Sequence, residues 1–368
     1  MKHWDIFCRV IDNYGDAGVC WRLAKQLSEE YGLSVRLWID DLNTLACLAS
    51  DISTHKTTEA IQPGLTVCHW PTPFPKINSA DVVIEAFACS LPESYVYTMA
   101  QQPIKPIWIN LEYLSMEDWV AGCHGLASPH PALDLTKYFF FPGPTAGGLL
   151  REYDLEKHQR SWTNYTYPIV DSVMYVSLFA YHNRALISLL STWAQGTQTV
   201  HCRAPIGLIT KQACSFFQKE NLQAGEVIKT GALTFEVLPF TGQIQYDKLL
   251  WQSDLNFVRG EDSFVRGQLA GRPIVWQTYP QQEQAHLDKL DAFLKLYSTK
   301  LSNQAQAAFT QLHYAWNTKQ ECMVEWLALY HHLDELKQHA QQWRQYLYSQ
   351  NDLTKNLYNF AHKKLQYH

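Results

Sequence analysis

The chain has 368 residues, of which 46% are hydrophobic, so it is long enough for two cores and we expect two domains. It carries 30 Lys and Arg against 35 Asp and Glu, and this net charge of −5 disfavours a nucleic-acid-binding protein. There is no apolar run of membrane-spanning length, no signal-peptide pattern, and no C-x-x-C pair among nine scattered cysteines. We therefore expect a cytoplasmic protein with reduced thiols, no membrane association and no metal site.

The first expected strand covers residues 3–10 and ends in a loop that holds two carboxylates, Asp12 and Asp16. The carboxyl end of such a strand is where open α/β sheets bind their ligands. Asp16 could instead be only the N-cap of the helix that follows, whereas a carboxylate at the strand end, such as Asp12, has no cap to make. The loop residues between them are candidate substrate-binding residues: Asn13, Tyr14 and Gly15.

Strands and helices alternate through the rest of the first 150 residues. Further strands are expected at 35–39, 65–70, 82–87 and 107–111, with a loop rich in Pro at 71–79. Glu85, Glu112 and Tyr113 lie at expected strand ends, where carboxylates would suit a basic protein partner or serve only the fold. Residues 142–148 mark the end of the first domain, and a charged segment at 151–165 is expected to be a linker.

A second alternating pattern, expected to form a domain over 166–349, starts with a strand at 172–179 and becomes helical after 283. Its other early strands are expected near 199–203 and 232–238. Phe179 lies at the end of the first of these strands, beside Tyr181, and Phe240 follows the third. Aromatic faces at strand ends can hold a nucleotide base, although both phenylalanines could equally be ordinary core residues.

Residues 255–276 read as strand, loop, helix and strand, with the helix over 264–270. The loop places Arg259 and Gly260 before a helix N-terminus, where free N–H groups and the helix dipole attract phosphate. A guanidinium can also donate two hydrogen bonds to the same anion. The alternative is structural: Asp262 or Ser263 caps the helix, and Glu261 pairs with Arg259 or Arg266.

Four segments together resemble the elongation factor P arginine rhamnosyltransferases, the EarP family of bacterial glycosyltransferases. They are DIFCRVIDNYGDAGVCWRLAKQL, WINLEYLSMEDWV, LPFTGQIQYDKLLWQSDLNFVRGEDSFVRGQLAGRPIVWQTYPQ and HLDKLDAFL. The resemblance covers essentially the whole chain. It implies an α/β fold of GT-B type, in which two Rossmann-like domains face each other across a cleft. It also implies a helical C-terminal tail whose last part, 350–368, joins the first domain, over 1–150.

The resemblance implies an inverting transfer of rhamnose from dTDP-β-L-rhamnose to an arginine of elongation factor P, with no metal or other cofactor. Asp16 then resembles the general base, with Asp12 as the supporting carboxylate. Glu261 would steady either the acceptor or the positive charge that develops on the donor sugar. The positions that match the family's donor site are Phe179, Phe240, Gln243, Arg259, Asp262 and Ser263, with Tyr279 as a further diphosphate candidate. The alternatives are another GT-B glycosyltransferase or a nucleotide-sugar epimerase acting on a small molecule, or a non-catalytic binding module.

Overall fold

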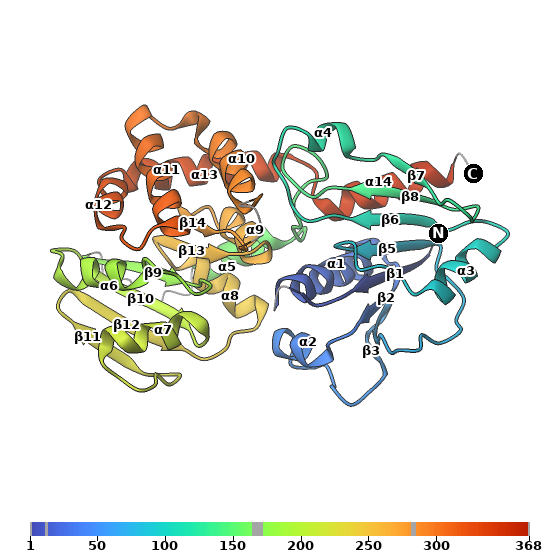
Figure 1. The fold of residues 1–368 in the computed structure, drawn as a ribbon, viewed down its shortest axis with the longest axis horizontal. Coiled ribbons are helices and arrows are strands. Elements are labelled where there is room, and N and C mark those ends of the chain that lie inside the picture. Colours follow the sequence, from blue (N-terminus) through green and yellow to red (C-terminus); the bar gives the residue numbers. More distant parts are fainter. Residues whose placement is uncertain (1, 12–13, 164–171, 281–284, 367–368) are drawn as a thin grey trace. The chain divides into compact units, whose positions relative to one another are not determined.

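The structure is a computed structural model that describes residues 2–11, 14–163, 172–280 and 285–366. The chain divides into two compact units, one formed by Met1–Tyr153 with Tyr348–His368 and the other by Asp154–Leu347. Each unit is built on a largely parallel sheet covered by helices (Figure 1). The segment expected to be a linker contains helix α5 (Leu155–Thr163), which packs against α8 (Gln243–Trp251) within the second unit.

The first unit contains an eight-stranded sheet in the order β3-β4-β2-β1-β5-β6-β8-β7. Its strands are β1 (His3–Cys8), β2 (Ser34–Ile39), β3 (Thr58–Gln62), β4 (Leu65–His69), β5 (Val82–Ala86), β6 (Ile107–Leu111), β7 (Ala127–Pro129) and β8 (Thr136–Phe140). All pairs are parallel except those of the edge strands β3 and β7. The chain adds β2 and β4 on one side of β1 and then returns to add β5, β6 and β8 on the other. The strand order therefore reverses between β1 and β5.

Helices cover both faces of this first sheet. They are α1 (Gly15–Tyr31), α2 (Leu42–Leu48), α3 (Glu93–Gln101), α4 (Val120–Cys123) and α14 (Leu353–Leu365). Because side chains alternate along a strand, Ile6 joins the core beneath α1 and α14 while Phe7 joins the core beneath α3. Leu353 and Leu357 of α14 are buried in the α1 core, and the Thr354 hydroxyl donates to Gln26 Oε1 at 2.6 Å. The tail helix is thus an integral part of the first unit.

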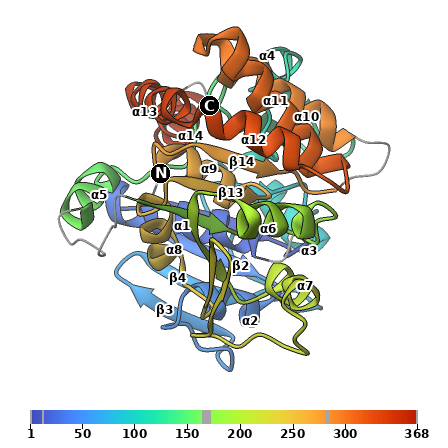
Figure 2. The ribbon, with the colours of Figure 1, turned by 90° about the vertical axis from the view of Figure 1, so that its left-hand side faces the viewer.

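The second unit contains a six-stranded sheet in the order β11-β12-β10-β9-β13-β14. Its strands are β9 (Val173–Leu178), β10 (Thr199–Pro205), β11 (Val227–Thr230), β12 (Leu233–Leu238), β13 (Leu255–Arg259) and β14 (Ile274–Gln277). Its other helices are α6 (Leu186–Gln195), α7 (Leu208–Phe217), α9 (Asp262–Leu269), α10 (Ala285–Tyr297), α11 (Asn303–Thr318), α12 (Met323–His331) and α13 (Leu333–Ser349), with a 3-10 turn at Ser298–Lys300. Helix α11 packs against β14 and α12, α12 also packs against α6, and α10 lies beside α11 (Figure 2). Here the strand order reverses between β9 and β13.

The strands expected from the hydrophobic pattern are confirmed, with end shifts of a few residues. Edge strands β3, β7 and β11 were not predicted, and neither was the interior strand β8, whose sequence TKYFF follows a stretch of turn residues. The helix expected over 264–270 begins earlier, at Asp262, so the loop before it is shorter than predicted. After α10, four helices follow within the described residues rather than two or three.

A buried ion pair joins α8 to α9 in the second unit. Arg266 Nε donates to Asp247 Oδ1 at 2.9 Å, and Nη2 donates to Oδ2 at 2.6 Å. The two side chains are only 2% and 6% exposed. Removing one partner leaves a buried charge without its counter-ion, whereas replacing both with apolar side chains leaves no charge in the interior. The pair therefore fixes the position of α9 relative to α8.

We expect Asp247→Ala to lower the free energy of unfolding by about 3–5 kcal/mol, because Arg266 then stays buried without its carboxylate. The double variant Asp247→Leu/Arg266→Met should recover most of that loss. Urea unfolding of the three proteins measures both effects. A double variant that is as unstable as Asp247→Ala would show that the pair does more than satisfy its own charges.

Candidate functional site

The carboxyl ends of β9 and β13 meet at one edge of the second sheet, where its strand order reverses. The two strands are parallel neighbours, with Phe257 opposite Leu178. Phe179 follows β9 directly, and its N–H donates to the Phe257 carbonyl at 3.1 Å. Arg259 is the last residue of β13. This reversal point is where open α/β sheets bind ligands, so the structure brings Phe179 and Arg259 to the expected place.

The guanidinium of Arg259 lies close to two aromatic rings. Its Cζ is 4.2 Å from the ring centre of Phe179 and 4.5 Å from that of Tyr181. Nη1 donates to the Ala180 carbonyl at 3.3 Å, and the residue is only 9% exposed. Stacking on aromatic faces fixes the plane of a guanidinium and removes little of its capacity to donate hydrogen bonds. Arg259 is therefore an oriented cation at the edge of the sheet.

Ser263 joins the end of β13 to the first turn of α9. Its Oγ accepts the Arg259 N–H at 2.9 Å and donates to the Arg259 carbonyl at 2.5 Å. Gly260 between them has a φ of +57°, which a glycine adopts without strain. The N-cap of α9 is Glu261, which makes no side-chain cap bond, so neither Asp262 nor Ser263 has the capping role considered above. The helix α9 thus begins three residues after Arg259.

Glu261 forms an ion pair that the sequence did not predict. Its Oε1 lies 3.6 Å from Lys289 Nζ, which belongs to α10. Arg266 instead pairs with Asp247. The carboxylate of Glu261 is therefore held at the start of α9 by a neighbouring helix.

Further aromatic side chains lie around this edge. The Tyr181 ring packs edge-on against Tyr279, with 5.5 Å between ring centres. The Phe179 ring lies 5.4 Å from that of Tyr246, which was not predicted as a site residue. Burial raises the pKa of the Tyr246 phenol, which lies near Ser263. The sequence did not reveal Tyr246, because its place on α8 depends on how that helix packs.

Two predicted donor-site residues lie on the segment after β12. Phe240 is 39% exposed, so the alternative that it is an ordinary core residue is wrong. Gln243 is the first residue of α8 and is buried. A ring that is partly exposed is available to stack on a planar ligand.

In the first unit, Asp16 lies in the first turn of α1, after the carboxyl end of β1. Tyr14 is the N-cap residue and Gly15 begins the helix, while Asp12 and Asn13 lie outside the described residues. The Asp16 carboxylate is buried, and its Oδ2 accepts the Ile11 N–H at 2.8 Å. Asp16 is therefore not the N-cap of α1, and the alternative that it serves only as a helix cap is wrong.

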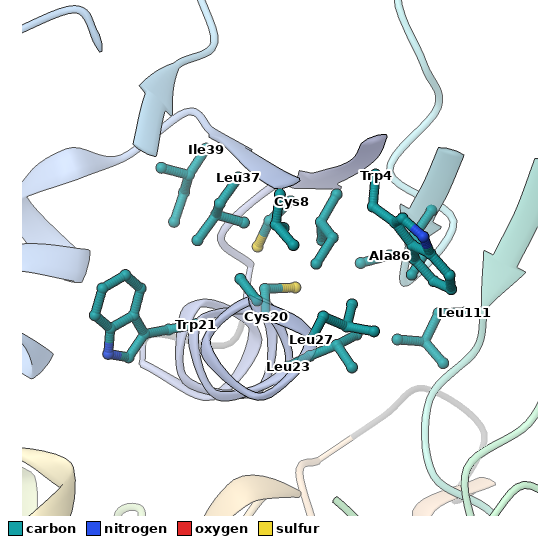
Figure 3. Close-up of a cluster of buried hydrophobic side chains, with 14 of the residues drawn as sticks. Trp4, Cys8, Cys20, Trp21, Leu23, Leu27, Leu37, Ile39, Ala86 and Leu111 are labelled. Carbon is teal, nitrogen blue, oxygen red and sulfur yellow. The ribbon is translucent and has the colours of Figure 1, made fainter. Parts of the chain in front are cut away.

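The thiols of Cys8 and Cys20 point toward each other between β1 and α1 (Figure 3). Their mutual hydrogen bond, together with burial and the nearby Asp16 carboxylate, raises the pKa of the Cys8 thiol well above its ordinary value. The Cys8 thiol therefore stays protonated at neutral pH.

Glu85 and Glu112 differ in their surroundings. Glu85 is buried, and its carboxylate accepts from Trp108 Nε1 at 3.0 Å and lies 3.3 Å from Lys137 Nζ. Its role is therefore within the fold. Glu112 is partly exposed and accepts from the side-chain amide of Asn110.

No helix among the described residues is both long and apolar enough to cross a membrane.

Comparison with known proteins identifies the family. The model of the Elongation-Factor P (EF-P) rhamnosyltransferase EarP family matches residues 4–362. A protein-arginine rhamnosyltransferase from Pseudomonas putida is 45% identical, over 98% of this chain and 99% of its own. One from Neisseria meningitidis is 34% identical, over 97% and 96%.

Solved structures agree with this assignment. A structure that concerns EarP-mediated arginine glycosylation of translation elongation factor EF-P has a TM-score of 0.69 at 34% identity and covers 99% of both chains. A glycosyltransferase of kitacinnamycin has a TM-score of 0.52 at 12% identity over 98% of both chains, a likeness of fold alone. The predicted GT-B fold and the predicted enzyme class, a glycosyltransferase of the protein-arginine rhamnosyltransferase type, are confirmed. This chain belongs to the EarP family of EF-P rhamnosyltransferases.

Proposed function

We propose that this enzyme transfers rhamnose from dTDP-β-L-rhamnose to an arginine side chain of translation elongation factor P, with inversion at the anomeric carbon. Binding of the sugar donor is supported by one observation, the Arg259 guanidinium stacked against Phe179 and Tyr181 at the start of α9. The family assignment supports the acceptor. Since that acceptor acts in translation, the reaction takes place in the bacterial cytoplasm, without a nucleic-acid or membrane partner.

The donor diphosphate binds at the start of α9. Arg259 donates to its oxygens, and the N–H groups at Asp262 and Ser263 lie at the positive end of the helix dipole. Phe179 and Phe240 hold the thymine, and Tyr181, Gln243 and Tyr279 line the rest of the donor site. When the bond from the anomeric carbon to the diphosphate breaks, these cationic and N–H groups stabilise the departing charge. No metal ion or other cofactor is part of this proposal.

The acceptor presents a weak nucleophile. An arginine guanidinium has a pKa above about 12, so it cannot lose its proton before the reaction. Asp16 accepts that proton while the guanidinium nitrogen bonds to the anomeric carbon and the diphosphate leaves. Its buried carboxylate is weakly screened, which strengthens a hydrogen bond to a cation. Asp12 supports it, Asn13, Tyr14 and Gly15 contact the acceptor, and Glu261, held by Lys289, steadies the charge that develops.

Arg259→Ala should weaken the binding of dTDP by about 2–4 kcal/mol, because it removes a charge-assisted pair of hydrogen bonds. Isothermal titration with dTDP measures the change. Arg160→Ala removes an exposed arginine of α5 in the same unit and serves as the matched control. Unchanged dTDP affinity in a folded Arg259→Ala protein would contradict the assignment.

Phe240→Ala should weaken dTDP binding by about 1–3 kcal/mol through loss of stacking on the base. Because the Phe240 ring is partly exposed, the melting temperature should hardly change. Leu327→Ala, at another partly exposed apolar residue of the second unit, should leave the affinity as it is. Equal dTDP affinities for the Phe240→Ala and wild-type proteins would show that Phe240 does not hold the base.

Asp16→Asn should lower the rate of rhamnosyl transfer by at least about a hundredfold, the lower range for loss of a general base. The amide retains an oxygen for the Ile11 N–H, and dTDP binding should be unchanged because Arg259 is intact. Single-turnover transfer beside a melting curve tests this.

The matched control for Asp16→Asn is Asp41→Asn. Asp41 is a true N-cap, with its carboxylate accepting from Asn43 N at 2.9 Å and Thr44 N at 3.1 Å. Asparagine caps helices well, so this variant should keep its activity. A stable Asp16→Asn protein with near-normal transfer would exclude Asp16 as the base.

A further inference from the structure

The first sheet reverses its strand order between β1 and β5, and the loop after β5 has an unusual backbone. The strands are parallel, with Phe7 opposite Glu85, so Phe87 follows β5 at the same edge where the chain leaves β1 toward Asp16. This reversal point is the ligand-binding position of such a sheet. Asp16, in the first turn of α1, supplies a carboxylate there. The loop after β5 has so far been given no role.

That loop holds an uncommon backbone conformation. Phe87, Ala88 and Ser90 have φ values of +55°, +52° and +56°, although none of them is a glycine. Left-handed conformations are rare for such residues and persist only where the surroundings enforce them. The Phe87 N–H donates to the Leu111 carbonyl at 2.7 Å, and the Ser90 N–H donates to Glu85 Oε1 at 3.2 Å. The loop is therefore tied to β6 and to the buried Glu85 carboxylate.

This conformation places the Phe87 ring against Tyr113, which follows β6. Their ring centres are 4.6 Å apart and their planes differ by 17°, a stacked pair. Phe87 belongs to the buried cluster that includes Ala17 and Cys20 of α1, and Tyr113 packs against the same cluster. The aromatic pair and Asp16 therefore share one edge and one face of the sheet. Phe87 is buried, whereas Tyr113 is partly exposed.

We propose that Tyr113, backed by Phe87, is the platform on which the acceptor guanidinium stacks while Asp16 accepts its hydrogen bond. A planar guanidinium can lie flat on an aromatic face and still donate to a carboxylate from its edge, which a lysine ammonium cannot do with the same geometry. The platform thus selects arginine over lysine and presents one nitrogen to the base. This inference rests on the proposed function, because it assigns part of the acceptor site of that reaction.

The test is steady-state rhamnosyl transfer to full-length elongation factor P at saturating dTDP-rhamnose, with variants of Tyr113. Tyr113→Leu removes the ring and should raise the KM for the acceptor by about 5- to 30-fold, the equivalent of a cation–π contact of about 1–2 kcal/mol. Tyr113→Phe keeps the ring and should restore most of the affinity. Tyr97→Leu, at an exposed tyrosine of α3 in the same unit, is the matched control and should leave the KM unchanged.

The affinity for dTDP and the melting temperature of each variant separate a lost platform from a damaged fold. An unchanged acceptor KM in a folded Tyr113→Leu protein would overturn the platform while leaving the proposed function intact. A Tyr113→Phe protein as impaired as Tyr113→Leu would also overturn it, because the ring alone would then be insufficient. No transfer by the wild-type enzyme would overturn the proposed function itself and the platform with it.

Discussion

The stacking of the Arg259 guanidinium against Phe179 and Tyr181 is the interaction on which the proposed donor site of the second unit depends. A long, flexible cation would otherwise have to be ordered by the ligand, at a cost in side-chain entropy. Here the rings and the Ala180 carbonyl order it beforehand, and Ser263 fixes the backbone behind it. The buried ion pair between Asp247 of α8 and Arg266 of α9 holds α9, whose N-terminus lies just after Arg259 in the chain. The neighbouring side chains and backbone thus fix the orientation of this one charge.

Both sheets offer a ligand-binding position of the same topological kind, but with side chains of opposite charge. Each sheet reverses its strand order next to its first strand, and the parallel strands open their carboxyl ends there. In the second unit this point carries Arg259 and a helix N-terminus, which suit an anion. In the first it carries the carboxylate of Asp16 and the stacked rings of Phe87 and Tyr113, which suit a cation. A diphosphate sugar and a guanidinium differ in charge in this same way.

The sequence predicted much of this architecture, because alternating apolar residues reveal buried parallel strands and because Gly260 before a helical pattern marks a strand–loop–helix turn. It could not exclude that Asp16 is only an N-cap, since a capping carboxylate also stands where a helix begins. Long-range pairing was also hidden: Lys289 as the partner of Glu261, and Tyr246 beside Phe179, depend on how separate helices pack. Short edge strands such as β11 carry too little hydrophobic pattern to be recognised.

The most direct test of the account is the intact mass of elongation factor P after incubation with this enzyme and dTDP-rhamnose, followed by peptide mapping of the modified position. The account predicts a gain of one deoxyhexose, located on an arginine side chain, and the release of dTDP in equal amount. Conversion of the nucleotide sugar without any change in the mass of elongation factor P, or a deoxyhexose on a residue other than arginine, would contradict it.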